Sequence, residues 1–192
     1  MPAPNPNALE FLQTRRSRPA KTLRAPWPDR DALMPLLTAA ARSPDHGKLE
    51  PWRFIVLQDT ALKRLADAVS ARGAALGMAA EQIEKGRTQF DQSGCAVAVI
   101  EVQKPSEKIP AIEQTYSAGA VCLALLNAAL AAGWGANWLS GWPSHDTLFG
   151  QEALGLAENE RIAGFIHIGT EGAIPPERPR PNIEEITSWL SD

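Results

Sequence analysis

Cysteine is scarce in this sequence: the 192 residues contain two, Cys95 and Cys122, each inside an apolar run. Two isolated thiols make no spaced disulfide framework, so we expect reduced, buried cysteines and a cytoplasmic protein. The three histidines, His46, His145 and His167, lie far apart and lack cysteine or carboxylate neighbours at the spacing of a metal site. The sequence therefore predicts no metal site.

An excess of charge of either sign is also lacking. Lys and Arg number 19 and Asp and Glu number 22, which leaves a formal net charge of −3. Such a balance gives no general attraction to nucleic acid or to an anionic membrane. The composition, 44% hydrophobic and 21% charged, is that of an ordinary soluble globular protein. We expect one compact domain over residues 1–192.

No hydrophobic run is long enough to predict a membrane span. The dense apolar part, Ala118–Ala132, is shorter than the roughly 17–25 residues that a spanning helix needs, and Asn127 interrupts it. The first seven residues have no basic segment followed by an apolar stretch, so we expect no signal peptide. The better interpretation of the apolar run is a buried helix, with no membrane partner.

Common catalytic motifs are missing as well. The sequence has no Gly-x-Gly-x-x-Gly after a strand and no Gly-x-x-x-x-Gly-Lys-Ser/Thr, which argues against a Rossmann dinucleotide site and a P-loop. It also has no Gly-x-Ser-x-Gly elbow. A hydrolase that uses Ser140, His145 and Asp146 stays open as an alternative, although these residues lie too close along the chain to be persuasive.

Helical and strand patterns follow one another along the whole chain. Asn5 or Asn7 and then Asp29 are suited to cap two early helices, and Ser144 is suited to cap a late one. The continuous apolar run 95–102 is typical of a strand covered on both faces. Further helices are expected over 61–80, 81–91, 110–132 and 144–154, and further strands over 52–57, 133–141 and 162–169. The class is α/β or α+β, and periodicity does not choose between them.

The helix expected over 110–132 is apolar on every side, so every side must be covered. One side can pack on the sheet, and the same helix of a second copy would cover the other, because symmetric pairs are the commonest oligomers. The small residues Ala118, Gly119 and Ala120 would allow a close approach. We predict a homodimer; the alternative is a central helix wrapped by its own chain.

Three polar clusters carry candidate binding residues. Arg15-Arg16-Ser17-Arg18 gathers three guanidinium groups around a hydroxyl, a combination that suits a phosphate. The same residues would also make an ordinary solvated helix end. The segment 42–52 is a rigid polar turn before a strand and is either a ligand-contacting loop or a structural turn. The segment 177–181 holds two more arginines in a proline-stiffened tail. The alternative is a tail that these charges only keep soluble.

Taken in order, these clusters resemble the nitroreductase family of FMN-dependent NAD(P)H oxidoreductases, over Leu9 to Ile186. Arg-Arg-Ser follows the first helix, and a segment ending in Pro-Trp precedes the first long strand. Gly-Trp-Gly-Ala-Asn-Trp follows the long helix, and Arg-x-Arg-Pro precedes Glu184-Glu185-Ile186. Pro44-Asp45-His46 and the short chain are most similar to the small YdjA-like subgroup of NAD(P)H nitroreductases.

The resemblance implies a fold and an activity. The fold is α+β, an α/β sandwich with a central, mostly antiparallel sheet flanked by helices and a long buried helix at the interface of a homodimer. The activity is transfer of a hydride from NADH or NADPH through bound FMN to a nitroaromatic, a quinone or a similar electron-poor small molecule. No side chain is expected to be catalytic, because the flavin carries the chemistry. The alternative is a flavin-binding or flavin-consuming protein without general reductase activity.

The resemblance also implies which residues hold the cofactor. Arg15, Arg16 and Ser17 would bind the FMN phosphate and ribityl chain, and the tail would add Arg180, with Arg178 beside it. Arg42 and His46 match subgroup positions that contact the flavin. The segment Trp138-Leu139-Ser140 matches the strand that contacts it.

Two positions depart from the broader family pattern. Lys48 stands where the family often has Asn, and Glu50 stands where it has Gln. Since that Asn usually bonds the flavin ring, His46 is a candidate to replace it. Lys48 would bring positive charge near the flavin and favour its anionic reduced form, or it is a surface lysine beside Glu50. The aromatic residues that would line an acceptor slot, or else pack in the core, are Trp134, Trp138, Trp142 and Tyr116.

Overall fold

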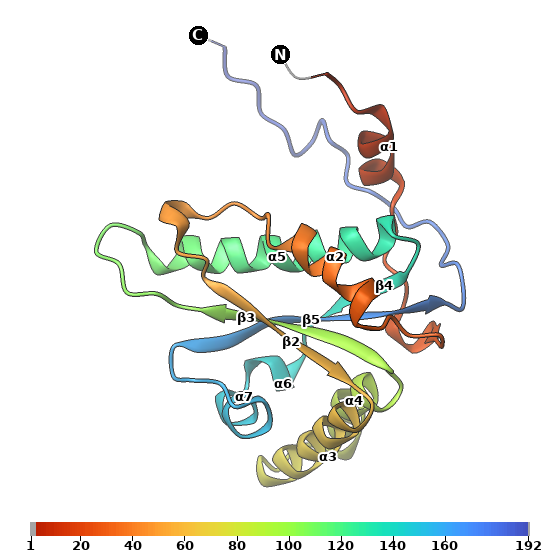
Figure 1. Ribbon diagram of the computed structural model, residues 1–192, viewed down its shortest axis with the longest axis vertical. Helices are drawn as coiled ribbons and strands as arrows, with labels where there is room; N and C mark the ends of the chain where they lie inside the picture. The colour runs from red at the N-terminus through yellow and green to blue at the C-terminus, as the bar shows by residue number, and fades with distance from the viewer. Residues whose placement is uncertain (1–2, 192) are drawn as a thin grey trace.

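In the computed structural model, which describes residues 3–191, an antiparallel sheet runs through the middle of the molecule with helices on both faces (Figure 1). The strands pair in the order β1-β5-β3-β2, and β4 pairs with β5. Every pair is antiparallel, which decides the class as α+β and confirms the fold that the resemblance implies. The strands are β1 (Leu23–Arg24), β2 (Trp52–Gln58), β3 (Cys95–Val102), β4 (Gly135–Leu139) and β5 (Glu160–Glu171).

The helices divide between the two faces of the sheet. On one face lie α2 (Arg30–Ala40) and α5 (Ala111–Ala131). The other face is covered by α3 (Thr60–Ala75), α4 (Ala80–Asp91) and α7 (Thr147–Leu154), with the short α6 (Trp142–His145) beside them. The remaining elements are α1 (Pro6–Thr14) and the short 3-10 turns η1 (Ala20–Thr22) and η2 (His46–Lys48).

Strand β3 explains why the sequence shows a continuous apolar run there. Side chains alternate along a strand, so Cys95, Val97 and Val99 pack against α2 and α5. The intervening residues pack against α3, α4 and α7. Both faces of β3 are therefore core, which confirms the buried strand that the sequence predicts.

The side chains expected to cap three helices do so at two of the three helix starts. Asn5 and Asp29 cap α1 and α2 as expected, accepting from backbone N–H groups at 3.1 and 2.9 Å. The expected Ser144 cap is wrong: Asp146 caps α7, its carboxylate accepting from the Phe149 N–H at 2.7 Å. Ser144 instead lies within α6, buried. The helix expected over 61–80 ends at Ala75, and the second residue beyond it, Gly77, takes φ 66°.

Helix α5 is covered on one side only. Its sheet-facing residues are buried, but Ile112, Tyr116 and Leu123 on the outer side are 51%, 68% and 45% exposed. By length and composition alone α5 is long and apolar enough to cross a membrane, yet its inner side packs on the sheet like the core helix of a globular fold. The predicted buried helix is thus half right, and the outer side stays uncovered in a single chain.

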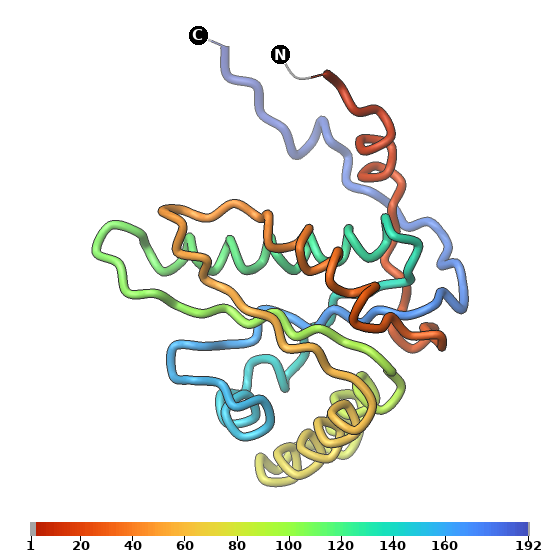
Figure 2. The backbone as a smooth tube through the Cα atoms, viewed as in Figure 1, coloured from red at the N-terminus to blue at the C-terminus, as the bar shows by residue number. Residues whose placement is uncertain are grey.

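The two ends of the chain project from the same side of the molecule (Figure 2). Helix α1 has no buried residue. The tail after β5 is mostly exposed and carries large apolar side chains, among them Ile183, Ile186 and Trp189, the last 90% exposed. Neither end is packed into the core of its own chain.

Candidate functional site

The segment Arg15–Arg18 follows α1 and is hydrogen-bonded to β4. The backbone N–H of Arg18 donates to the Ala136 carbonyl at 2.8 Å, and the Asn137 side-chain amide donates to the Arg18 carbonyl at 2.8 Å. The Arg18 guanidinium donates to Glu171 of β5 at 2.5 Å. These contacts bring the first cluster beside the strand that carries the candidate residues 138–140.

Arg15 is partly buried among other cations. Its Nη2 donates to the Ser17 hydroxyl at 3.0 Å, while its buried Nε has no hydrogen-bond partner within residues 3–191. Burial, followed by the charges of Arg180, Arg16 and Arg18, lowers the pKa of Arg15. Neighbouring cations repel one another, and an unpaired buried donor is costly, so this arrangement favours a bound anion.

The C-terminal tail joins this arginine cluster through Glu177. Arg16 donates to the Pro176 carbonyl at 2.5 Å and lies 3.3 Å from the Glu177 carboxylate. Arg180 approaches the same carboxylate at 2.9 Å, and the Arg178 backbone N–H donates to it at 3.0 Å. One carboxylate therefore holds the tail against the first cluster, so Arg15, Arg16, Ser17 and Arg180 come together from opposite ends of the sequence.

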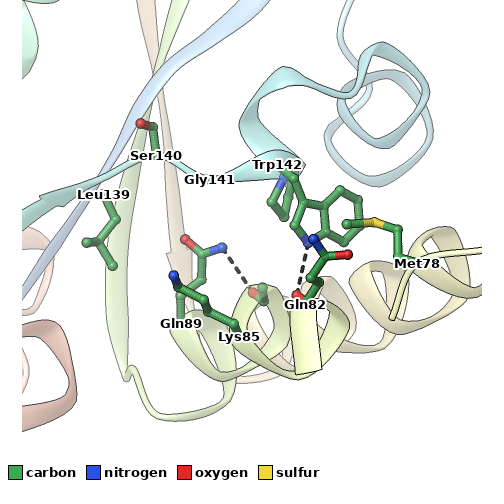
Figure 3. A pocket seen from close by; sticks show the side chains of 10 residues that line it. Met78, Gln82, Lys85, Gln89, Leu139, Ser140, Gly141 and Trp142 are labelled. Carbon is green, nitrogen blue, oxygen red and sulfur yellow. Dashed lines mark hydrogen bonds between the residues drawn. The ribbon is translucent and has the colours of Figure 1, made fainter. Parts of the chain in front are cut away.

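A groove lies between α4 and β4, and Figure 3 shows part of it. It consists of two hollows of about 360 and 340 Å³ that share Lys85, Gln89 and Leu139 as lining residues. The first hollow continues along Ser140, Gly141, Trp142 and Met78, and the second continues along Asn137 and residues 19–21. We call this the α4–β4 groove.

Sequence reasoning missed Lys85 and Gln89. They lie four residues apart on α4 and therefore project from the same side of the helix. Figure 3 places both side chains across from Leu139, where the Gln89 amide donates to the Gly86 carbonyl at 3.0 Å. A polar pair at this spacing is equally typical of a solvated helix face, so only the groove distinguishes it.

The three residues 138–140 do not all face the groove. Leu139 and Ser140 line it, but the Trp138 side chain points to the other face of the sheet, as alternation along a strand requires. The Trp138 indole packs over Gly164, where an added Cβ would lie 2.0 Å from the indole nitrogen. Any contact of Trp138 with a ligand in the groove would therefore come from its backbone.

The four aromatic residues proposed for an acceptor slot are separated within one chain. Trp142 lines the α4–β4 groove, with its indole N–H donating to the Gln82 carbonyl at 3.3 Å. Trp134 packs against the core under α2 and α5, and Tyr116 lies on the exposed side of α5. A single chain therefore has no slot made of all four.

Arg42 and His46 lie away from the arginine cluster. His46 Nδ1 is 2.7 Å from the Glu113 carboxylate in the first turn of α5, whereas β4 follows the end of that helix. The 21 residues of α5 span about 30 Å. Figure 1 shows the connection between α2 and β2, which carries both residues, toward the start of α5. Within one chain the structure does not bring Arg42 and His46 to Arg15 or Ser140.

The hydrolase alternative finds no support in the geometry. Both oxygens of the Asp146 carboxylate accept from Arg72, at 2.8 and 2.9 Å, and this hydrogen bonding lowers the pKa of Asp146. Ser140 lines the α4–β4 groove, while His145 and Asp146 line a separate hollow of about 280 Å³. Asp146 therefore serves Arg72 and the start of α7, and no triad forms.

The buried titratable groups outside the site are unsuited to nucleophilic chemistry. Burial raises the pKa of Cys95 to about 11 and that of Cys122 to about 12, which keeps both as thiols. Burial lowers the pKa of His167 to about 4, and its Nδ1 bonds the Ser93 hydroxyl at 3.0 Å. Residues 3–191 contain no group of three or more His, Cys, Asp or Glu side chains placed to hold a metal ion.

Comparison with known proteins identifies relatives over most of the chain. Residues 12–170 match the model of the nitroreductase family. The Escherichia coli (strain K12) protein named "Putative NAD(P)H nitroreductase YdjA" is 33% identical over 164 residues, which cover 85% of this chain and 88% of the relative.

Solved structures show the same fold. A nitroreductase-like family protein from Bacillus cereus superimposes with a TM-score of 0.80 at 26% identity, covering 99% of this chain and 98% of the other. A "putative nitroreductase in complex with fmn" from Desulfovibrio desulfuricans gives a TM-score of 0.76 at 19% identity, covering 98% and 99% of the two chains.

Proposed function

Because the chain belongs to the nitroreductase family, we propose that it is an FMN-dependent oxidoreductase, which passes a hydride from NADH or NADPH through bound FMN to an electron-poor acceptor such as a nitroaromatic or a quinone. The observation that carries the proposal is the unpartnered Nε of Arg15 in an arginine cluster whose Arg18 is hydrogen-bonded to β4, one wall of the α4–β4 groove. An anion site on the segment that leads to this groove fits a cofactor with a phosphate at one end and a flat ring at the other.

The arginine cluster would hold the FMN phosphate. Arg15, Arg16 and Arg180 offer planar guanidinium donors that match phosphate oxygens in pairs, and Ser17 adds a hydroxyl. A dianionic phosphate would offset the burial and, after it, the repulsion among cations that together lower the pKa of Arg15.

The α4–β4 groove would receive the flavin ring. Leu139 supplies an apolar wall, the backbone at Ser140 follows it, and Lys85 and Gln89 present polar groups from the opposite wall. When bound, FMN supplies the hydride transfer itself. The chain anchors the phosphate, orients the ring and sets the charge around it.

A second copy of the chain would complete the site. A two-fold axis crossing the middle of α5 sets the start of one α5 beside the end of the other, which would carry Arg42 and His46 toward the partner's groove. The exposed Tyr116 and Leu123 would be buried by this pairing, and a Cβ at Gly119 would meet nothing within 4 Å, so the helices are free to approach closely there. The projecting α1 and tail offer further apolar surface to the partner.

The compartment proposed is the cytoplasm. Cys95 and Cys122 are both free and buried, and such thiols persist where the surroundings are reducing. NADH and NADPH, the proposed donors, would be used in that same compartment.

A visible absorption spectrum of the purified protein, recorded before and after anaerobic NADH and NADPH, tests the function. A flavin spectrum that either nucleotide bleaches is the expected result and identifies the donor. A flavin spectrum that neither bleaches would favour the flavin-binding or flavin-consuming alternative. A colourless protein that takes up no added FMN would overturn the proposal.

A further inference from the structure

His46 and Glu113 form a hydrogen-bonded pair that the sequence does not reveal, because 67 residues separate them. The Nδ1 atom of His46 lies 2.7 Å from the Glu113 carboxylate, and the two side chains are 60% and 43% exposed. The pair lines a hollow of about 380 Å³ on the outer side of α5, together with Pro44, Asp45, Tyr116, Ser117 and Ala120.

The loop that carries His46 is held in one conformation. The Ser117 hydroxyl donates to the Pro44 carbonyl at 2.6 Å, which ties the loop to α5. Gly47 takes φ 71°, and a Cβ there would lie 2.6 Å from the Ile109 side chain. Lys48 and Glu50 also take positive φ, at 55° and 47°. A strained backbone of this kind persists only where surrounding contacts maintain it, and it is found most often at functional sites.

The geometry decides which imidazole nitrogen exchanges a proton. A carboxylate only accepts hydrogen bonds, so the Nδ1 atom facing Glu113 carries hydrogen. The other nitrogen, Nε2, is then the one left to face a bound molecule. The titratable groups that line the same hollow are Glu113 and Tyr116 from α5 and Asp45 from the loop itself.

We propose that His46 is the proton donor to the electron acceptor and that Glu113 is a positioning residue that holds its ring. The inference rests on the proposed function, in which a second copy carries His46 to its partner's flavin. Hydride transfer delivers two electrons and one proton, whereas two-electron reduction of a quinone needs two protons. His46 Nε2 supplies the second proton.

One hydride and one proton from His46 complete the two-electron reduction of either class of acceptor. With a quinone, the hydride supplies one hydrogen and an electron pair, so negative charge develops on a carbonyl oxygen. The Nε2–H bond of His46 then breaks as that oxygen is protonated, which gives the hydroquinone. With a nitro group, hydride and proton together convert R–NO₂ to R–NO and water, as one N–O bond breaks. The electrons come from NADH or NADPH through FMN. The exposed imidazole then regains its proton from solvent.

A comparison of two electron acceptors distinguishes proton donation by His46 from a role of His46 in binding the flavin. The FMN-loaded, pre-reduced protein is mixed rapidly with 1,4-benzoquinone, which needs protons, or with ferricyanide, which accepts electrons alone. His46→Gln should slow reoxidation by benzoquinone about 10²-fold and change reoxidation by ferricyanide less than twofold. His145→Gln, which alters an exposed histidine in a different hollow, should change neither rate.

Each contrary result has a distinct meaning. An unchanged benzoquinone rate in His46→Gln would show that His46 donates no proton. Equal slowing with both acceptors would show that His46 only holds the flavin. Failure of the unaltered protein to bind FMN would overturn the proposed function instead.

The role of Glu113 has a readout that needs no cofactor. Imidazole ¹⁵N NMR of the protein without FMN should show hydrogen on Nδ1 of His46, with a shift toward the Nε2–H form in Glu113→Ala. The benzoquinone rate should fall in Glu113→Ala by a smaller factor than in His46→Gln. If the His46 tautomer is unchanged in Glu113→Ala, the positioning role is wrong.

Discussion

The Asn137 side-chain amide donates to the backbone carbonyl of Arg18 at 2.8 Å, although 119 residues separate the two. The contact makes the Arg15–Arg18 segment an extension of the edge formed by β4. The Arg15–Arg18 segment and the α4–β4 groove consequently share β4 as a support. In the proposed FMN complex, the sheet would therefore position the phosphate end and the ring end relative to each other.

Replacing Arg15 should weaken FMN binding. Arg15→Ala removes the buried guanidinium with the unpartnered Nε, and the loss of a charge-assisted contact should cost about 1–3 kcal/mol of binding free energy. Arg16→Ala should lose a similar amount. Fluorescence titration with FMN measures both, and Arg24→Ala, whose exposed guanidinium donates to the Gly172 carbonyl, is the matched control. Equal affinity in Arg15→Ala and the unaltered protein would move the phosphate elsewhere.

A charge on the outer side of α5 should separate the dimer and release FMN. Leu123→Arg places a cation where the second copy is proposed to pack, and Leu123 is 45% exposed in the single chain, so the fold itself should survive. Light scattering should report the mass of a monomer, and the flavin absorbance should fall. Leu148→Arg, on the exposed side of α7, should leave both unchanged. A dimer that persists in Leu123→Arg would place the interface on another surface.

Removing Lys85 should lower the reduction potential of the bound flavin. Its ammonium lines the groove proposed for the ring, and a nearby cation stabilises the added negative charge of the reduced form. Lys85→Ala should shift the potential by on the order of 30 mV, equivalent to about 1.4 kcal/mol for two electrons.

Spectroelectrochemistry of matched lysine variants locates the effect. Lys63→Ala, on the exposed side of α3, should not change the potential. Lys48→Ala tests the hypothesis that Lys48 acts on the flavin. If Lys48 lies near the ring, the reduction potential of the flavin should fall in this variant too. A potential unaffected by Lys85→Ala would remove Lys85 from the ring site.

Stability should rise between about pH 4 and pH 6.5 because of His167. Burial lowers the pKa of His167 from 6.5 to about 4, so in that window the unfolded chain binds a proton that the folded chain excludes. As pH falls through this range, the protein should lose about 3 kcal/mol of unfolding free energy on this account.

Urea unfolding at fixed protein concentration measures this slope. His167→Gln should flatten the dependence over that pH range, even if the variant is less stable throughout. His145→Gln, which removes an exposed histidine, should keep the full slope. An identical slope in His167→Gln would mean that carboxylates alone cause the pH dependence.

Local patterns determined much of the fold. The run over β3, the Asn5 and Asp29 caps and the long apolar helix each depend on residues a few positions apart, and each was predictable. The Ser144 cap failed because serine and aspartate both suit a helix start, and the pattern does not choose between two such residues so close together.

The sequence by itself also placed Arg15, Arg16 and Ser17 together, because they are neighbours in the chain, and from their chemistry it predicted a phosphate site. Tertiary structure alone decided which other groups join them. Lys85 and Gln89 belong to a groove only because α4 packs opposite β4, and His46 meets Glu113 only because its loop folds onto α5. These contacts join residues far apart in sequence, whose proximity depends on how whole elements pack and leaves no mark in the order of residues.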